Sequence, residues 1–405
     1  MRASNGESSH FRVAVRAWLA DHAPSWLPDG SSVPEQLAAA KGFQAALWEA
    51  GFAGITWPFE YGGQGLSQAD QQTFDEEARA YDLPVAPFVI GLGMCGPTIV
   101  DLGTEEQKRR FIAPMLRGEE IWCQLFSEPG AGSDIASLQM RAEPYGDSWI
   151  LTGQKLWTTG AQNSDFGVVL ARTDSDVPKH RGLTMFIVDM RAPGVEVRPL
   201  RVMSGQSPFN EVHFNGAAVP GSAVLGVVNE GWAAAVAMLG HERVSIGTLA
   251  PPTSDPLGYT SLLQAARAHG RDMNPVVRDQ LADAYGQERA LQLFVARLRQ
   301  EAESGRDPGA RGSIAKLVAA NISRQAVALA GLAGSADAVA WSPEDASSEQ
   351  LAIAVLSDPG IHLAGGTDEI QRNIIGERVL GLPKEPQVDR DVPFRELKVG
   401  TQRTI

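Results

Sequence analysis

Cysteine is nearly absent from this sequence, with two residues in 405. Cys95 and Cys123 are too few for a disulfide framework or a structural zinc site, so we expect a reducing compartment, a cytoplasmic location and no metal. Positive charge is also scarce: 35 Lys and Arg residues stand against 48 Asp and Glu, which gives a net charge of −13. That balance argues against binding to nucleic acid or to an anionic membrane surface.

Long apolar runs are missing as well, and none approaches the roughly 20 residues of a membrane-spanning helix. The N-terminus contains arginines and serines, as a transit peptide does, but Glu7 and Asp21 interrupt it. Phe11, Val15 and Leu19 follow a helical period there, so we predict an ordinary first helix. The length of the chain predicts two or three sub-domains rather than one core.

The sequence pattern changes twice along the chain. Residues 1–120 have helical periodicity, most clearly over 105–116, where Thr104 is a candidate N-cap and Gly118 follows the end. Residues 121–228 contain short strand-like runs separated by turn residues, and helical periodicity returns over 229–405. We therefore predict a mainly α protein with a central β domain. The predicted strands are 149–151, 166–171, 183–188, 195–199 and 211–214.

Residues 122–160 form the most informative segment. The glycine-containing loop 128–134, EPGAGSD, follows one strand, and a second strand ends at residues 157–159, WTT. Glycines let a backbone approach a bulky ligand closely, and hydroxyls beside them can hydrogen-bond a heteroaromatic ring on which a tryptophan stacks. An ordinary turn with a core tryptophan is an equally good reading of this composition. The candidate contacts are Ser127, Ser133, Trp157 and Thr159.

Glu242 is the candidate general base. It lies on the apolar stripe of a helix that begins at Gly231, four residues from Met238 and from Ile246. A carboxylate there must be paired, or else lie in a cavity that raises its pKa, because burial of an isolated charge is costly. The alternatives are a structural ion pair with another helix and a base in a dry pocket.

A third motif begins at Gly365 and Gly366, which precede Thr367 and an amphipathic helix. Two glycines before a capping threonine are typical of a helix start that binds an anion or a polar ligand. A capped helix that needs a glycine turn would have the same pattern.

Together these motifs resemble the acyl-CoA dehydrogenase family over nearly the full chain. The matching segments are WPFEYGGQGLS at 57–67, SEPGAGSD at 127–134, GQKLWTTG at 153–160 and GGTDEIQRNIIGERVLGLPKE at 365–385. The resemblance implies a helical N-terminal domain over 1–120, a central β-barrel domain over 121–228 and a C-terminal four-helix bundle domain over 229–405. It also implies that FAD lies between the last two domains.

Carried over position by position, the resemblance implies a set of cofactor contacts in which Trp157 flanks the flavin ring and Thr159 reaches N5. Thr367 and Glu369 would lie near the ribityl-pyrophosphate. The implied cofactor contacts are Gln124, Phe126, Ser127, Gly132, Ser133, Trp157, Thr158, Thr159, Thr367 and Glu369. The implied acyl-CoA contacts are Ser133, Leu239, Arg243, Gly365 and Gly366.

The sequence departs from the commonest family members at the base. Those members place a glutamate just before the Gly-Thr of the C-terminal motif, where this chain has Gly365. A minority place the base on the bundle helix before an arginine, as Glu242 and Arg243 stand here. The resemblance then implies α,β-dehydrogenation of an acyl-CoA, with Glu242 removing the α proton and flavin N5 accepting the β hydride. An electron-transferring flavoprotein is the implied acceptor.

A second departure concerns the adenosine part of the FAD site. Residues 269–280 and 328–338 do not match the segments that bind a neighbour's FAD in homotetrameric members. This pattern resembles the base-bearing subunit of actinobacterial steroid-side-chain acyl-CoA dehydrogenases, in which two paralogous chains form an α2β2 assembly. A homo-oligomer is the alternative. Other functions for the same fold are a flavin monooxygenase, an acyl-carrier-protein dehydrogenase and a non-catalytic scaffolding subunit.

Overall fold

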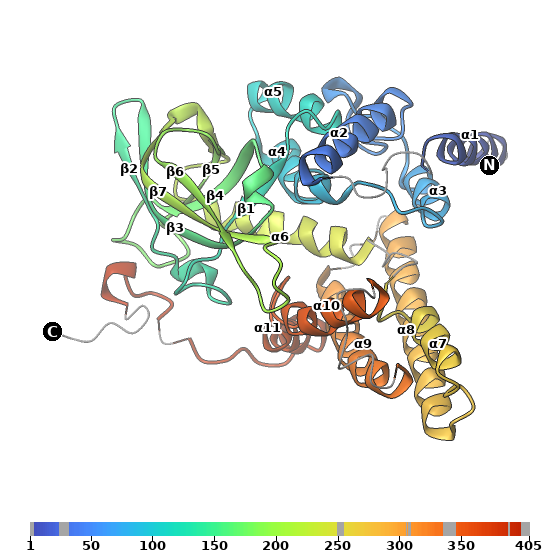
Figure 1. Ribbon diagram of the computed structural model, residues 1–405. Helices are drawn as coiled ribbons and strands as arrows, with labels where there is room; N and C mark the ends of the chain where they lie inside the picture. The colour runs from blue at the N-terminus through green and yellow to red at the C-terminus, as the bar shows by residue number, and fades with distance from the viewer. Residues whose placement is uncertain are drawn as a thin grey trace.

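The computed structural model describes residues 4–23, 32–248, 255–304, 306, 309–334, 346–387 and 389–397. In sequence order these residues form a helical N-terminal part, a central sheet and a helical C-terminal part (Figure 1). The predicted fold class, mainly α with a central β domain, is confirmed.

The N-terminal part contains both helices that the sequence predicted. The first helix buries Val15 and Leu19 completely. The predicted helix over 105–116 begins and ends at those residues, because the Thr104 hydroxyl accepts from the N–H of Gln107 and Gly118 turns the chain away with a φ of +70°. The elements are α1 (Ser4–His22), α2 (Val33–Glu49), α3 (Gln68–Ala78), the π-helix η4 (Gly91–Cys95), α4 (Gly96–Leu102) and α5 (Glu105–Leu116).

The central part is one mixed sheet with the strand order β6-β7-β3-β2-β4-β5-β8, and β1 pairs in parallel with β4. Each of the five predicted strands falls inside one of β3 to β7. The sequence did not predict β2, where Pro144 and exposed charged residues obscure the alternation. The strands are β1 (Trp122–Leu125), β2 (Arg141–Tyr145), β3 (Ser148–Thr159), β4 (Phe166–Arg172), β5 (Leu183–Asp189), β6 (Val195–Leu200), β7 (Phe209–Pro220) and β8 (Val224–Leu225).

The C-terminal part is helical, and its own core includes Leu262, Leu281 and Leu329. Residues 335–338, at the end of the segment 328–338 named in the sequence analysis, lie outside the described residues. The elements are α6 (Gly231–Thr248), α7 (Tyr259–Ala268), α8 (Pro275–Glu303), α9 (Gly312–Ala333), α10 (Ala346–Ile361), α11 (Asp368–Ile374) and the π-helix η10 (Ile375–Val379).

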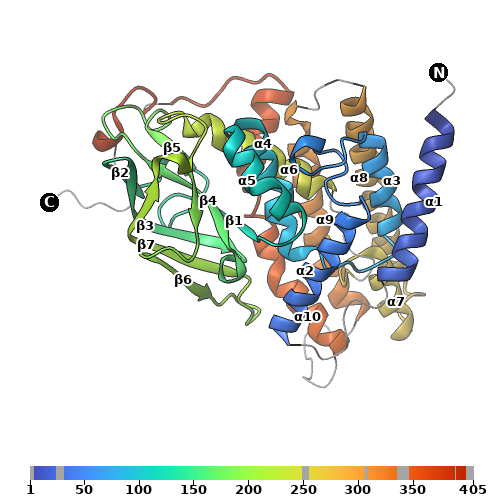
Figure 2. The same ribbon diagram turned by 90° about the horizontal axis from the view of Figure 1, so that it is seen from above.

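Helix α6 is the central element of the molecule. It contacts η4 and α4 from the N-terminal part, β5 from the sheet and α9 from the C-terminal part. Figures 1 and 2 show it running from the sheet into the space between the other helices. Its residues Ala235 and Met238 are fully buried in a core cluster shared with η4, α5 and the sheet. Over the described ranges, no helix combines the length and apolar character needed to cross a membrane.

Candidate functional site

Two strand ends meet beside the glycine loop. β1 ends at Leu125 and continues through Phe126 and Ser127 into the loop 128–134. β3 passes alongside, because the N–H of Leu156 donates to the carbonyl of Ser127 at 2.9 Å. The predicted segments 124–133 and 157–159, which are far apart in sequence, are therefore held close together.

A buried ion pair joins these strand ends. Lys155 has no exposed surface, and its Nζ donates to Glu128 Oε1 at 2.8 Å and to the carbonyl of Phe126 at 3.0 Å. The Glu128 carboxylate also accepts from the backbone N–H groups of Gln139 and Met140, at 2.7 and 3.0 Å. Burial lowers the pKa of Lys155, and the nearby Glu128 charge opposes that shift. Every polar atom of the pair has a partner, which is the condition for a stable buried pair.

A β-bulge directs Trp157 away from the core. Between Lys155 and Thr158 the register with β7 shifts by one residue. Trp157 lies in this bulge with a φ of +60°, which is unusual for a bulky side chain. The residue is 53% exposed, and its ring makes an edge-to-face contact with Phe209, with centroids 5.7 Å apart. Trp157 is therefore not the core tryptophan of the alternative interpretation, and most of its ring can contact a ligand.

Three buried polar atoms near these strand ends have no hydrogen-bond partner in the described part of the chain. They are Nε2 of Gln124, Oγ1 of Thr158 and Oδ1 of Asn210, which lies opposite Thr158 in β7. Buried polar groups are normally paired, so a polar ligand or water is expected to complete them. The ring of Phe126 lies in the core and is 4% exposed, so its side chain is not available to a ligand. The remaining predicted contacts here are the half-buried Ser127 and the exposed Gly132, Ser133 and Thr159.

The start of α6 is fixed against β5. Asn229 takes a φ of +67°, and its backbone N–H donates to the hydroxyl of Thr184 at 2.9 Å. Gly231 follows, and a Cβ at that position would lie 2.7 Å from the Cα of Thr184. A side chain at residue 231 would therefore push α6 off the sheet.

Glu242 lies on the predicted face of α6. Leu239, one turn earlier, packs against the core that contains Ala235 and Met238. The Glu242 side chain is half-buried and is engaged by an interaction within the chain. The preceding residue, His241, pairs with Asp101 of α4 at 2.8 Å. The side chains of Arg243 and Ile246 lie outside the described residues.

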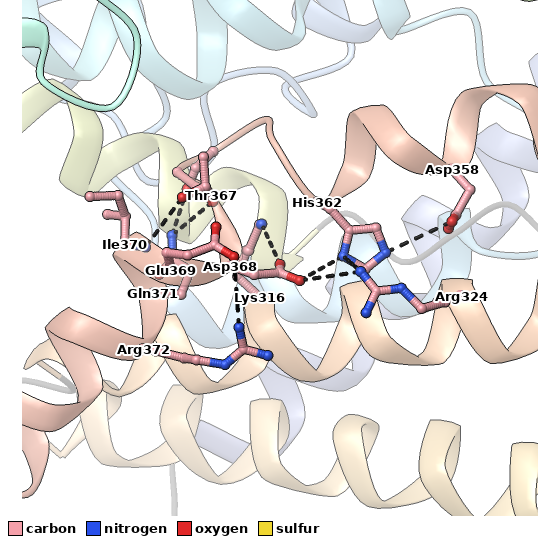
Figure 3. Close-up of polar contacts among 12 residues, drawn as sticks. Lys316, Arg324, Asp358, His362, Thr367, Asp368, Glu369, Ile370, Gln371 and Arg372 are labelled. Atoms are coloured by element: carbon pink, nitrogen blue, oxygen red, sulfur yellow. Dashed lines mark hydrogen bonds and ion pairs between the residues drawn. The ribbon is translucent and has the colours of Figure 1, made fainter.

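The glycine turn of the C-terminal motif lies between α10 and α11 (Figure 3). Gly365 and Gly366 have φ angles of +64° and +90°, so both need glycine. Thr367 caps α11, and its hydroxyl accepts from the N–H of Ile370 at 3.3 Å. The buried amide of Gln371 donates to the carbonyl of Gly365 at 2.8 Å, which fixes the orientation of the following peptide. Both the capped-helix interpretation and the ligand-binding interpretation agree with this geometry.

A cluster of charged and polar side chains connects this turn to α9. His362 Nδ1 lies 2.7 Å from Asp368 Oδ2, which joins the two ends of the turn (Figure 3). Lys316 and Arg324 from α9 approach the same carboxylate at 3.5 and 3.6 Å. The Asp368 carboxyl is penalised by burial, but His362 and Lys316 outweigh that and lower its pKa. Glu369, by contrast, is exposed and lies 3.9 Å from Arg372. Within the described ranges, no group of three acidic, His or Cys side chains is placed to hold a metal.

Comparisons with known proteins agree with these motifs. The acyl-CoA dehydrogenase N-terminal, middle and C-terminal domain models match residues 5–119, 123–217 and 229–380. The acyl-CoA dehydrogenase IpdE1 of Mycobacterium tuberculosis is 36% identical over 93% of this chain and 98% of its own length. The chain belongs to the acyl-CoA dehydrogenase family. The resemblance stated from the sequence is confirmed, and the protein is an acyl-CoA dehydrogenase, from a family of flavoprotein oxidoreductases of lipid β-oxidation.

Other relatives extend this result. The acyl-CoA dehydrogenase FadE34 of M. tuberculosis is 40% identical over 84% of this chain, which spans only 46% of that longer protein. The Tcur3481–Tcur3483 steroid ACAD has a TM-score of 0.76 at 28% identity and covers 94% of this chain and 99% of its own. The ChsE4–ChsE5 complex of M. tuberculosis has a TM-score of 0.75 at 28% identity, over 95% of this chain and all of its own.

The sequence did not predict several residues that hold the candidate site together. Lys155 and Glu128 lie inside the quoted motifs, but neither was assigned a role. A lysine in a predicted strand end, with a glutamate at the start of the glycine loop, was the available signal. Gln371 and His362 carried no such signal, because their contacts depend on the shape of the glycine turn.

Proposed function

We propose that this acyl-CoA dehydrogenase converts an acyl-CoA thioester to the trans-2-enoyl-CoA with FAD as cofactor and Glu242 as base. The observation that carries the proposal is the position of Glu242. It is a half-buried acid on α6, the helix that contacts all three parts of the molecule, while Gly365 at the other candidate position has no side chain. We also propose the domain limits 1–120, 121–228 and 229–405.

The residues at the two strand ends fit FAD. Gln124 Nε2 is a buried donor without an acceptor, and the oxygens of a flavin pyrimidine ring are acceptors. The exposed ring of Trp157 offers a stacking surface, and the hydroxyls of Ser127 and Thr159 offer hydrogen bonds. The chemistry that FAD supplies when bound is acceptance of the β hydrogen as hydride. The proposed holding set is Gln124, Phe126 through its backbone, Ser127, Gly132, Ser133, Trp157, Thr158, Thr159, Thr367 and Glu369.

The chain's own residues carry out the proton transfer. Glu242 removes the proton from Cα, so its carboxylate becomes a carboxylic acid and the electron pair stays on the substrate. The N–H of Gly365 donates to the thioester oxygen, where negative charge accumulates, and that increases the acidity of Cα. The apolar neighbours Leu239 and Met238 exclude water from this side of the helix. Ser133, Arg243 and Gly366 complete the proposed substrate contacts.

We propose a bulky or branched acyl group, of the steroid-side-chain type, and a paralogous chain as partner in an α2β2 assembly. Support comes from the two structures at 28% identity, one of which is called a steroid ACAD and the other a complex of ChsE4 with ChsE5. Residues 269–280, which include Met273 and Arg278, lack the adenosine-binding pattern, so a partner would complete the FAD site. An electron-transferring flavoprotein is the proposed electron acceptor.

The experiment that tests the base is Glu242→Gln, assayed with octanoyl-CoA and with a CoA thioester that carries a steroid side chain. We expect kcat to fall by at least about 100-fold, with flavin content and thermal midpoint unchanged. Asp101→Asn is the control. Asp101 of α4 pairs with His241, the residue before Glu242 on α6, so the change perturbs the same helix and leaves Glu242 in place. Turnover near the wild-type rate in Glu242→Gln would exclude Glu242 as the base.

The assembly is tested by flavin content after expression of the chain alone and together with its paralogue. One FAD per two chains, found only on co-expression, supports the shared-site heteromer. One FAD per chain in the protein expressed alone, with acyl-CoA oxidation, would replace it with a homo-oligomer. Oxygen insertion in place of an enoyl-CoA product would favour the monooxygenase, and an inactive pair would favour a scaffold.

A further inference from the structure

The chain crosses from the helical part to the sheet after η10, and its segment 389–397 docks there. Figures 1 and 2 show the chain leaving α11 and ending beside the strands. The docking surface is the loop 173–182 between β4 and β5. The N–H groups of Phe394 and Arg395 donate to the carbonyls of Val177 and Ser175, at 2.9 and 3.0 Å. The contact is therefore built from backbone pairs as well as side chains.

Two buried cations connect this segment to the end of the EPGAGSD motif and to the residues that follow it. Lys179, which is 9% exposed, donates to Asp389 Oδ2 at 2.7 Å and to Asp134 Oδ2 at 2.9 Å. Arg172, which is 4% exposed, lies over the ring of Phe394 at 3.6 Å. Arg172 also donates to the carbonyls of Ala136, Leu138 and Lys179. Three segments that are distant in sequence are thus tied together at one place.

The glycine loop needs such an anchor at its far end. Its first residue, Glu128, is fixed by the buried pair with Lys155, but residues 129, 130 and 132–134 are exposed. A Cβ built at Gly132 would meet nothing within 4 Å, so the side-chain direction at this position faces open space. Ala131 is buried in the core and exchanges two backbone hydrogen bonds with Glu128. After Ala131, the next anchored residue is Asp134, which is held by Lys179 and the hydroxyl of Ser137. Ser133 is therefore held from two sides, by the buried Ala131 before it and by Asp134 after it.

We propose that residues 389–397 form a strap that positions the Ser133–Asp134 turn for coenzyme A, with Lys179 as the positioning residue that joins the strap to the turn. The ligand part of this inference rests on the proposed function, because that function makes Ser133 an acyl-CoA contact. The strap itself rests only on the contacts above. The same loop also touches the start of the Glu242 helix, where His180 packs edge-on against Trp232 with centroids 4.8 Å apart.

The test compares Lys179→Met and Asp389→Asn with Asp176→Asn in the full-length chain. Asp176 pairs with Arg395 at 2.7 Å on the exposed side of the same loop and does not touch Asp134, so it is a matched control. Hydrogen exchange over residues 130–138 measures the anchoring without any ligand. Calorimetric titration with coenzyme A measures binding, and flavin content reports on the cofactor site.

We expect the first two variants to speed exchange over 130–138 and to weaken coenzyme A binding about two- to fivefold, as for loss of one partly exposed ion pair. Flavin content should stay at the wild-type level, and Lys179→Arg should restore part of the protection. Asp389→Asn is an isosteric change at a partly exposed side chain, so it should fold even if Lys179→Met does not. If this variant exchanges hydrogen over 130–138 at the wild-type rate, the strap is overturned. If coenzyme A does not bind the wild-type protein, the ligand part and the proposed function are overturned together. The hydrogen-exchange measurement, which needs no ligand, still tests the strap in that case.

Discussion

Replacing Lys155 by methionine should damage this protein more than any surface charge change, for a reason that can be worked out from its contacts. The Nζ atom is fully buried and lies 2.8 Å from Glu128 Oε1 and 3.0 Å from the carbonyl of Phe126. Methionine fills similar space but removes the cation and both hydrogen bonds. Glu128 would keep its two backbone donors and the nearby charge of Arg172, and would lose the cation that is hydrogen-bonded to it.

Removal of one partner from a buried ion pair costs about 3–5 kcal/mol, because the remaining charge stays buried without compensation. The Glu128→Gln/Lys155→Met double variant should lose less stability than the two single losses added together. We expect a coupling energy of about 1–3 kcal/mol from this cycle. Arg198→Met is the control, since Arg198 pairs with Glu196 on the exposed surface of the same sheet. Its cost should be within about 0.5 kcal/mol.

The assay is urea unfolding followed by tryptophan fluorescence, with flavin content measured on the folded protein. Lys155→Met should lower both the free energy of unfolding and the flavin content, because the Ser127 and Trp157 strand ends are no longer held at a fixed spacing. A loss below about 1 kcal/mol, or a coupling energy near zero, would refute the reasoning. The strand ends would then be held by the β1–β4 and β3–β7 ladders alone.

Two further predictions concern the glycine turn and the first helix. Gly366→Ala should lower the free energy of unfolding by about 1–3 kcal/mol and lower kcat/KM, because φ is +90° and the new Cβ would lie 2.6 Å from Gln371 Nε2. Gly360→Ala is the control, since a Cβ there meets nothing within 4 Å. Equal effects of the two substitutions would contradict the predicted strain at Gly366. Hydrogen bonds from Arg16 and Arg12 lower the pKa of Glu77 to about 2. A depressed acid stabilises the folded state above its unfolded pKa and loses that effect as pH falls. The difference in free energy of unfolding between wild type and Glu77→Gln should therefore be about 1 kcal/mol at pH 7 and should shrink as the pH falls from about 4.5 towards 2. A difference that does not change with pH would contradict this prediction.

The parts of the fold that could be predicted from the sequence are those whose signals are local. The helix α5 begins at a threonine cap and ends at a glycine, and both residues act within one turn of the helix. The strands β4 and β5 are continuous apolar runs, so their limits were visible. The strand β2 was not predicted, because only Ala142 of its five residues is buried and its burial comes from pairing with β3.

The candidate site also contains residues that could be predicted from local signals and residues that could not. The hydroxyls, glycines and Trp157 could be chosen from residue type alone, since those types suit a heteroaromatic ligand wherever they lie. The exposure of Trp157 could not be predicted, because it follows from a bulge whose register is set by β7. The pairing of Lys155 with Glu128 spans 27 positions and arises only when β1 and β3 are brought together. The strap at 389–397 has no periodicity that would predict it.

The contacts around the glycine loop have a common physical basis. A loop that must approach a large planar cofactor needs glycine, and glycine leaves the backbone free to adopt many conformations. Cations outside the loop then hold its two ends: Lys155 pairs with Glu128, and Lys179 pairs with Asp134. Arg172 binds the carbonyl of Ala136 just after the loop. These contacts order the loop from its ends, without filling the space the ligand needs. It follows that substitution of these cations is a sharper test of site geometry than substitution of the glycines, because a glycine variant changes the loop and the ligand contact at once.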